Sequence, residues 1–425
     1  MKLSLRNIGI INQADINLDG LTVIAGDNDT GKSFAGRTLF SIIKASNSSG
    51  IVFTDELERN IKDIVQEIYI EIRKNLDKEG NRILFDILNP GSFIKELRSA
   101  VVAENVFKIE DIIQKRISLL KTSSINKPLL NILLPKLEDL RTVLGIKDTE
   151  DKNKIQSKTY KEILQKEFNY NIRNMHSKDN GKISFSEGSN ELLNIQLSNG
   201  NIEVEYSDNL LVPTATLIET PFILQMEGLF GNYNKSLPVH ITDLFEKLTG
   251  SMGYFDDDTD IFLKKIESTI QGDWDYDTEK DDFIFSKEIS GEKHSFDSLN
   301  TATGIKSFGI ISLLKKAGVL DKRCVLIIDE PEVHLHPKWQ IEYAKIITEL
   351  VKEGIIVLVT THSPYMVQAF SVFSKEADIK SDFYLSHKND NGTAEIENVS
   401  EDINKIFLQL SKPLNDIVWG QKYAL

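Results

Sequence analysis

The sequence predicts an α/β protein with a mixed sheet, antiparallel β strands and a helical insertion. Short apolar runs typical of parallel strands buried on both faces occur at Leu21–Ala25, Cys324–Ile328 and Ile355–Thr360. A helical pattern near Trp339–Glu353 joins the second run to the third, and this β-α-β order builds a parallel sheet. A long segment with helical periodicity separates the first run from the other two.

The 425 residues are enough for several domains, and their patterns divide the chain into four segments. We expect the first part of an α/β core at 1–50, a helical insertion at 51–175, β strands of the core at 176–236 and the second part of the core at 237–425. Apolar residues at steps of three and four from Leu57 to Leu76 predict an amphipathic helix in the insertion. Pro90, Pro128 and Pro135 are expected to break the insertion into several moderate helices.

Local periodicity predicts the remaining elements. Strands are expected at 3–7, 14–18, 183–185, 192–197, 202–206, 214–219, 283–285, 294–296, 382–386 and 393–399, with a hairpin turn at Ser198–Asn201. Helices are expected at 34–45, within 237–270, from about 305 and at 403–410. The acidic run Asp256–Asp258 lies in a polar, glycine-flanked stretch, which favours a solvated loop over a metal site.

A phosphate-binding loop follows the first apolar run. Gly26–Ser33 reads G-D-N-D-T-G-K-S and matches G-x-x-x-x-G-K-[ST], with a strand before it and a helix after it. Glycines let backbone N–H groups converge on phosphate oxygens, and the following helix N-terminus adds a positive dipole. We expect ATP to be bound by Gly26, Asn28, Asp29, Thr30, Gly31, Lys32 and Ser33.

Two adjacent carboxylates, Asp329 and Glu330, follow the second apolar run, where Pro331 must end the strand. Ligands of open parallel sheets bind beyond the carboxyl ends of the strands. One carboxylate there can hold Mg²⁺ while the other activates a water molecule. Solvated acids at a strand end are the alternative, but the phosphate loop favours the nucleotide site.

Composition limits the compartment and the partners. Cys324 is the single cysteine and lies in an apolar run, so we expect no disulfides and a reducing, cytoplasmic location. The sequence shows neither a signal-peptide pattern nor a run of about 18 apolar residues, so no membrane association is expected. The net charge is −14, yet Ile51–Met175 carries +2 and Ile112–Leu137 has five basic residues and no acid. That run is either a solvated helix face or a docking surface for DNA or an acidic partner.

These motifs, in this order, resemble the ABC-type ATPase heads of the SMC, RecF and OLD kind. The resemblance is carried by residues 1–45 and about 280–412, through G-D-N-D-T-G-K-S, L-I-I-D-E-P-E-V-H-L-H-P and T-T-H-S-P. It implies that Asp329 holds Mg²⁺ together with Ser33, that Glu330 polarises the attacking water and that His362 senses the γ-phosphate. The loop Val333–Pro337 would cross between subunits and bring His336 to the nucleotide.

The signature loop of such heads corresponds to Thr301–Lys306, read T-A-T-G-I-K. Thr303 and Gly304 are expected to contact the ATP of a partner subunit. The family pattern resembles L-S-S-G-E-K, so alanine replaces serine and isoleucine replaces a polar residue here, which leaves the rate of hydrolysis open. Gln225 is a candidate for the glutamine loop. A metal pair of His334 and His336 is disfavoured because no third ligand has suitable spacing.

The resemblance implies a Mg-ATP-dependent switch ATPase that pairs head to tail as a homodimer or higher homo-oligomer. It is similar to the ATPase subunits of Septu- or PARIS-type anti-phage systems, which control a separate effector, expected here to be a nuclease. A DNA-repair ATPase of the RecF kind that clamps DNA directly is the alternative. A transporter nucleotide-binding subunit fits less well, because it would have an intact L-S-G-G-Q and a shorter insertion. No nuclease-like acidic cluster follows His362, which favours an effector in trans.

Overall fold

The chain divides into two compact units in the computed structural model, one made of residues 1–46 with 163–425 and the other of residues 47–162. The structure describes residues 1–47, 55–75, 93–94, 96–97, 111–118, 127–143, 152–174, 179–198, 201–207, 210, 214–226, 237–250, 260–277, 280 and 282–418. Among these residues, no helix is both long and apolar enough to cross a bilayer.

Within the described part of the first unit, eleven strands form one mixed sheet. Five neighbouring strands at one end of the sheet run parallel: β13 (Ser381–Lys388), β3 (Leu21–Gly26), β12 (Ile356–Thr361), β11 (Cys324–Asp329) and β7 (Thr214–Ile218). All six residues of β3 are buried, as expected for a strand covered on both faces. The three predicted parallel strands are therefore confirmed.

The rest of the sheet is mostly antiparallel. It contains β14 (Ala394–Asn398), β2 (Ile11–Asn17), β1 (Lys2–Ile8), β4 (Gly181–Glu187), β5 (Asn190–Ser198) and β6 (Asn201–Ser207). Burial alternates along β4, as it does in strands that have one buried face. A separate sheet contains β8 (Asp273–Asp277), β9 (Asp282–Ile289) and β10 (Glu292–Asp297). The predicted hairpin at 283–296 is confirmed. The strand β8 was not predicted, because its three aspartates are not typical of a strand.

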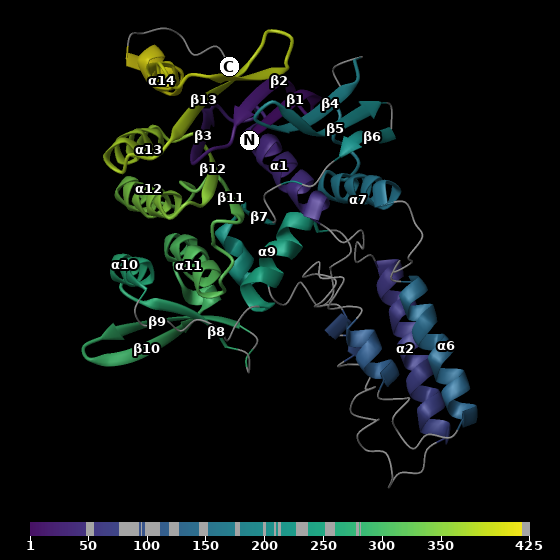
Figure 1. Cartoon of the computed structure of the whole chain (residues 1–425). Coiled ribbons are helices and arrows are strands. Elements are labelled where there is room, and N and C mark those ends of the chain that lie inside the picture. Colours follow the sequence, from purple (N-terminus) through teal and green to yellow (C-terminus); the bar gives the residue numbers. More distant parts are fainter. Residues whose placement is uncertain are drawn as a thin grey trace. The chain divides into compact units, whose positions relative to one another are not determined.

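Helices cover both faces of the parallel strands (Figure 1). The helix α1 (Lys32–Asn47) lies on one side, and α12 (Pro337–Lys352) and α13 (Pro364–Glu376) lie on the other. The remaining elements of this unit are η1 (Pro221–Gln225), α9 (Val239–Gly250), α10 (Ile261–Ile270), η2 (Ser298–Asn300), α11 (Thr303–Lys316) and α14 (Asn404–Val418). Ser363 caps α13 by accepting from the N–H of Met366, and the proline after it begins the helix.

The second unit is helical where it is described. The helices α2 (Asp55–Asn75) and α6 (Lys127–Val143) pack together, and the buried residues are Ile61, Val65 and Ile68 of α2 and Leu133, Leu137 and Leu140 of α6. Pro135 lies inside α6, so the expectation that it ends a helix is wrong. The apolar stripe on both sides of Pro135 is buried, and this burial offsets the lost backbone hydrogen bond.

The helix α7 (Lys152–Glu167) contains residues of both units. The second unit ends at Glu162, whereas the insertion was expected to extend to 175. The reason is packing, because Glu167 forms an ion pair with Arg37 of α1 and Phe168 stacks on Phe34. The last turn of α7 therefore belongs to the unit that contains the sheet.

Some predicted features lie outside the described residues. They are the acidic run Asp256–Asp258, the two central residues of the turn at Ser198–Asn201, and the middle of the basic run Ile112–Leu137. On both sides of that turn, β5 and β6 pair antiparallel, with Ser198 opposite Asn201.

Candidate nucleotide-hydrolysing site

The phosphate loop joins β3 to α1 and depends on two glycines. Gly31 has φ +88°, and a Cβ at this position would lie 2.6 Å from Cγ1 of Ile11. A Cβ on Gly26 would lie 2.1 Å from the carbonyl oxygen of Ser386. Any other residue would therefore push the loop away from the strands beneath it, which explains why these two positions are glycine.

Residues from distant parts of the chain hold this loop. The hydroxyl of Thr30 donates to the carbonyl of Asp27 at 2.8 Å, and the hydroxyl of Ser386 donates to the carbonyl of Thr30 at 2.8 Å. Lys388 forms an ion pair with Asp29, and Gln409 of α14 donates to Asp27. The loop is thus tied to β13 and α14, which the sequence motif does not indicate.

Lys32 lies at the start of α1 and is 3% exposed. Its Nζ donates to the carbonyl of Asp27 at 2.7 Å and lies 3.5 Å from Oε1 of Glu330. Ser33, the next residue, interacts with the carboxyl of Asp329 and lowers its pKa. A hydroxyl and a carboxylate are oxygen ligands of the kind that Mg²⁺ prefers, so this pair fits a nucleotide-bound Mg²⁺. The structure therefore brings Lys32, Ser33 and Asp329 together at one edge of the parallel strands.

The two carboxylates at the end of β11 have different environments. Burial raises the pKa of Asp329, and hydrogen bonds from Thr360 and Ser33 oppose that rise. His362, whose Nδ1 lies 3.7 Å from Oε1 of Glu330, lowers the pKa of that carboxyl, and the nearby Lys32 lowers it further. Glu330 also has φ +44°, and its N–H donates to the carbonyl of Thr360 at 3.1 Å. A left-handed backbone is unusual for glutamate and turns this residue sharply out of the strand.

His362 follows β12, the neighbour of β11. Its Nδ1 lies 3.1 Å from Oε1 of Glu332 and 3.7 Å from Oε1 of Glu330. Glu330, together with the charge of Glu332, raises the pKa of His362, although burial opposes the shift. The buried Glu332 also accepts from the hydroxyl of Thr361 at 2.7 Å and from the N–H of His362 at 2.6 Å. Glu332 thus positions His362, a role that its place in D-E-P-E could have suggested.

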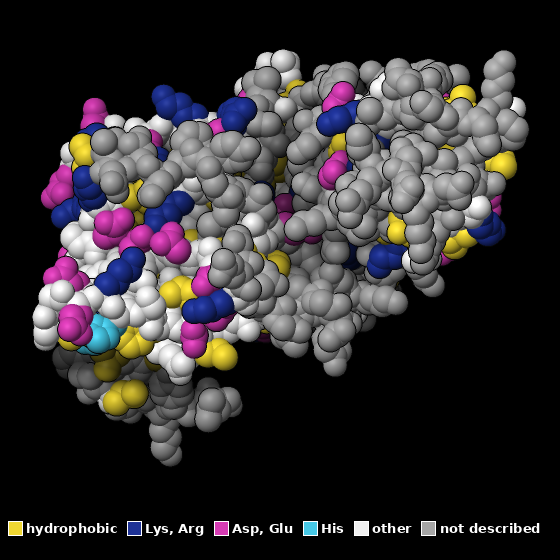
Figure 2. Space-filling view, turned by 90° about the horizontal axis from the view of Figure 1, so that it is seen from below, with side chains coloured by type: hydrophobic (Ala, Val, Ile, Leu, Met, Phe, Trp, Pro, Cys, Tyr) yellow, Lys and Arg dark blue, Asp and Glu magenta, His cyan; other side chains and the backbone are white. Residues whose placement is uncertain are grey.

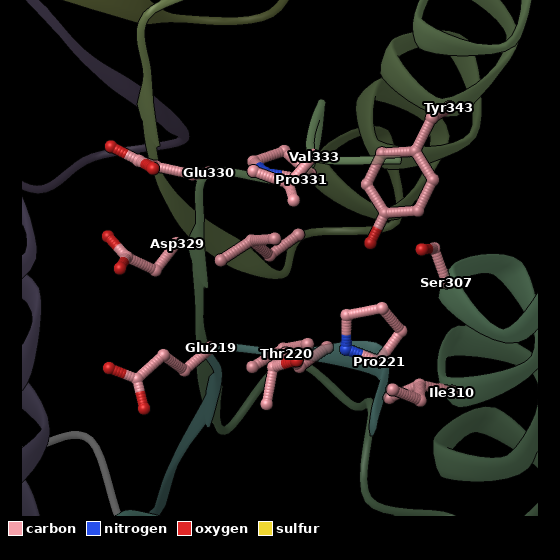
Figure 3. A pocket seen from close by; sticks show the side chains of 12 residues that line it. Glu219, Thr220, Pro221, Ser307, Ile310, Asp329, Glu330, Pro331, Val333 and Tyr343 are labelled. Atoms are coloured by element: carbon pink, nitrogen blue, oxygen red, sulfur yellow. The ribbon is translucent and has the colours of Figure 1, made fainter. Parts of the chain in front are cut away.

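A third carboxylate, Glu219, lies at the same edge. It directly follows β7, where Ile218 is opposite Ile328, so Glu219 is level with Asp329. Figure 3 shows that the side chains of Glu219, Asp329 and Glu330 all extend to the same side. On the other side lies a pocket of about 210 Å³ lined by these strand ends and by Ser307 and Tyr343. The sequence pattern predicts Glu219 only as the last residue of a strand and indicates no role for it.

Glu219 is the more exposed end of a chain of charged groups whose middle members, Glu167 and His240, are fully buried. Nε2 of His240 lies 2.9 Å from Oε2 of Glu219, and Nδ1 lies 2.6 Å from Oε1 of Glu167. Arg37 of α1 donates from Nε to the same oxygen of Glu167 at 2.7 Å. Burial opposes protonation of His240, but the hydrogen bonds and charges of Glu167 and Glu219 prevail and raise its pKa to about 9. Arg37, Glu167, His240 and Glu219 are hereafter the buried charge chain.

The other predicted site residues are Thr303, Gly304, His336 and Gln225. Thr303 and Gly304 begin α11, whose N-cap Ala302 makes no side-chain cap. His336 caps α12 by accepting from the N–H of Lys338 at 3.3 Å, and Gln225 donates to the carbonyl of Ser298 at 3.3 Å. Across the described residues, no group of three or more His, Cys, Asp or Glu is placed to hold a metal.

The phosphate loop, two carboxylates and a histidine lie together at one edge of the parallel strands, an arrangement typical of nucleotide-hydrolysing sites. The sequence matches the model of the AAA ATPase domain family over residues 1–367. The chain belongs to this family of ATPases.

Several individual proteins are similar to the chain. The Septu protein PtuA of Bacillus thuringiensis is 41% identical over 54 residues, and the match covers 13% of this chain and 13% of that protein. The SMC head domain of Thermotoga maritima is 11% identical, with coverage of 94% of this chain and 98% of that one, at a TM-score of 0.38. An SMC head bound to the C-terminal winged-helix domain of ScpA is also 11% identical, covers 95% and 98% in the same order, and has a TM-score of 0.43.

His240 predicts a specific pH dependence of stability. The folded chain raises the pKa of His240 from 6.5 to about 9, so its stabilising effect is complete below the lower value and disappears as pH rises through the upper one. The shift corresponds to roughly 3 kcal/mol of unfolding free energy. We expect urea unfolding to show that this contribution is lost between about pH 6 and pH 10, and that His240→Gln lacks it. A constant difference between the two proteins over this range would contradict the assignment.

Proposed function

We propose that the chain is a Mg-ATP-dependent switch ATPase in which ATP binding pairs two copies head to tail and hydrolysis separates them. The observation that carries the proposal is the convergence of Lys32, Asp329, Glu330 and His362 at one edge of the parallel strands. Phosphoryl transfer depends on charge neutralisation and on a positioned water more than on covalent chemistry. These four side chains are the groups that this chemistry needs.

Each side chain has a role that its surroundings support. Lys32 neutralises the β- and γ-phosphates, and Ser33 with Asp329 would hold Mg²⁺, whose positive charge offsets that of the phosphates. Glu330, kept ionised by His362 and Lys32, accepts a proton from the attacking water. His362, oriented by Glu332, donates to the γ-phosphate.

Two groups of the chain itself contact Lys32 in the site. The ammonium group of Lys32 lies between the carbonyl of Asp27 and the carboxylate of Glu330. Phosphate oxygens are stronger partners for an ammonium group than a carbonyl, so ATP would draw Lys32 away from both. Glu330 would then lose its nearest cation and be available to the water. Binding and activation of the base are coupled in this way.

The proposed pairing depends on the start of α11. Ala302 is its N-cap and makes no side-chain hydrogen bond, so the first backbone N–H groups lack the usual cap. A helix N-terminus of this kind suits the γ-phosphate of ATP held by a second copy. The backbone amides and Thr303 remain for this contact. Because no serine hydroxyl stands at Ala302, we propose slow hydrolysis.

We further propose that the ATPase controls a separate protein effector, a nuclease, in anti-phage defence. The similarity to a Septu protein supports this proposal. Charge favours a protein over DNA as the principal partner, because the net charge is −14. On the coloured part of the face in Figure 2, moreover, basic and acidic side chains are intermixed.

Replacing the proposed base should separate binding from hydrolysis. Glu330→Gln keeps the shape of the side chain but cannot accept the proton, so we expect the hydrolysis rate to fall by about 100-fold or more. ATP affinity, measured by fluorescence titration, should stay within a few-fold. Lys32→Ala is the contrasting variant and should weaken ATP binding by roughly 10- to 100-fold. Undiminished hydrolysis by Glu330→Gln would show that another group is the base.

A mixture of two inactive variants tests the pairing. Lys32→Ala removes the phosphate contact in one copy, and Gly304→Asp places a negative charge at the start of α11 in the other. Each variant alone has two defective sites per pair, whereas a mixed pair retains one intact composite site. ATPase activity in the mixture, with none in either parent, is the expected result. No recovery at any mixing ratio would count against the head-to-tail arrangement.

An effector in trans predicts that the purified chain has no cleavage activity of its own. With Mg²⁺ or Mn²⁺ and plasmid DNA, phage DNA or tRNA, it should hydrolyse ATP and leave the nucleic acid intact, as judged by gel electrophoresis. DNA should also leave the hydrolysis rate unchanged. Strong stimulation of hydrolysis by DNA would favour a DNA-clamping ATPase instead.

A further inference from the structure

Glu219 is held in one orientation beside Asp329. The parallel register places the two residues level on adjacent strands, and both carboxylates extend to the same side (Figure 3). One oxygen of Glu219 is bound by His240 at 2.9 Å. A hydrogen bond from His240 lowers the pKa of Glu219, so the carboxylate is ionised. A negative charge is therefore fixed next to the residue that we assign to Mg²⁺.

The buried charge chain connects this carboxylate to the phosphate-loop helix. Its members come from four elements: Arg37 from α1, Glu167 from α7, His240 from α9 and Glu219 from the end of β7. Glu167 and His240 are both fully buried. The backbone N–H of His240 also donates to Oε2 of Glu167 at 3.1 Å, so this histidine is fixed through two bonds to one carboxylate.

The charges in the chain balance. Two cations alternate with two carboxylates, so each charge has an opposite neighbour, and the two inner members, Glu167 and His240, are fully buried. Removing one member of a buried ion pair leaves its partner unpaired and costs several kcal/mol, roughly 3 to 5 in known cases. Such an arrangement resists displacement of any one member.

We propose that His240 is a positioning residue of the ATPase site: clamped by Glu167 and Arg37, it fixes Glu219 beside Asp329 and thereby sets how strongly this edge attracts the nucleotide-bound cation. The proposal rests on the function proposed above for Lys32, Ser33 and Asp329. In this proposal His240 acts through Glu219, and neither residue has to contact the nucleotide.

The physical reason is the distance dependence of charge interactions. Two like charges on adjacent strand ends repel each other, and in a partly buried site this repulsion changes steeply with separation. The charge of Glu219 contributes to the raised pKa of Asp329, after burial and the nearby Glu330. A divalent cation removes the repulsion, so the edge favours the cation as long as Glu219 stays in place. If His240 is removed, Glu219 can turn to solvent, and this edge then attracts the cation less strongly.

A double-mutant cycle tests this route of action. Binding of Mn²⁺ to the protein with ADP is measured by electron paramagnetic resonance for the wild type, His240→Ala, Glu219→Gln and the double variant. We expect each single variant to bind Mn²⁺ about 5- to 10-fold more weakly. The double variant should be no weaker than Glu219→Gln alone, because His240 then has no carboxylate left to position. Full additivity of the two effects, or unchanged Mn²⁺ affinity in His240→Ala, would overturn the proposal.

Asp243→Asn is the matched control. Asp243 lies one turn after His240 on the same helix, is also buried, and pairs with Lys44 of α1 and with Lys247. It therefore resembles His240 in burial and in its link to α1, but its partner Lys247 contacts Ala215 and Thr216 rather than the strand end. We expect this variant to lose stability and to keep wild-type Mn²⁺ affinity. Equal loss of Mn²⁺ binding in Asp243→Asn would mean that general loosening explains the effect.

Two further measurements keep the outcomes distinct. If His240→Ala does not fold, His240→Gln retains part of the hydrogen bonding without the charge and takes its place in the cycle. If the wild type binds no Mn²⁺ with ADP, or Lys32→Ala binds ATP normally, the proposed function fails as a whole. If the wild type binds Mn²⁺ with ADP and Lys32→Ala weakens ATP binding, but the cycle is additive, the proposed function stands and only the role assigned to His240 is wrong.

Discussion

The parallel hydrogen-bond register of β3, β12, β11 and β7 is the constraint on which the site depends. Ile218 is opposite Ile328, and Thr360 is opposite both Asp329 and Ile24, so the strands end at one level. Side chains that follow these strands then meet at one edge without any long loop to place them. A shift by one residue in the pairing of β7 with β11 would turn Glu219 to the other face of the sheet, away from Asp329.

The parts of the site that could be predicted from the sequence are those encoded by contiguous residues. The phosphate loop and the acidic pair after Ile328 each need a strand, a turn and a few side chains in fixed order, so a short motif contains all the information. The three buried strands were predictable for the same reason, because a continuous apolar run is a local property. The predicted position of His362 beside the acidic pair also agrees with the structure, since adjacent strands bring the two motifs together.

What could not be predicted depends on contacts between distant residues. Glu219, His240 and Glu167 belong to separate elements, and neither periodicity nor spacing brings them together. Glu219 looked like the last residue of a strand, and His240 looked like any histidine near the start of a helix. Only the packing of α1, α7 and α9 places the three in one hydrogen-bonded chain. Pro135 was misjudged for a related reason, because the burial that maintains α6 comes from another helix.

The position of β3 has a consequence for how the protein forms. This strand lies between β12 and β13, so residues 21–26 find their neighbours in residues 357–361 and 381–386. Pairing over such sequence separations is slow and is exposed to competing association. During synthesis, the apolar strand that carries the phosphate loop must wait for most of the chain to leave the ribosome. The phosphate loop is therefore completed late in synthesis, and a chain cut short before β12 would leave the apolar strand β3 without these two neighbours.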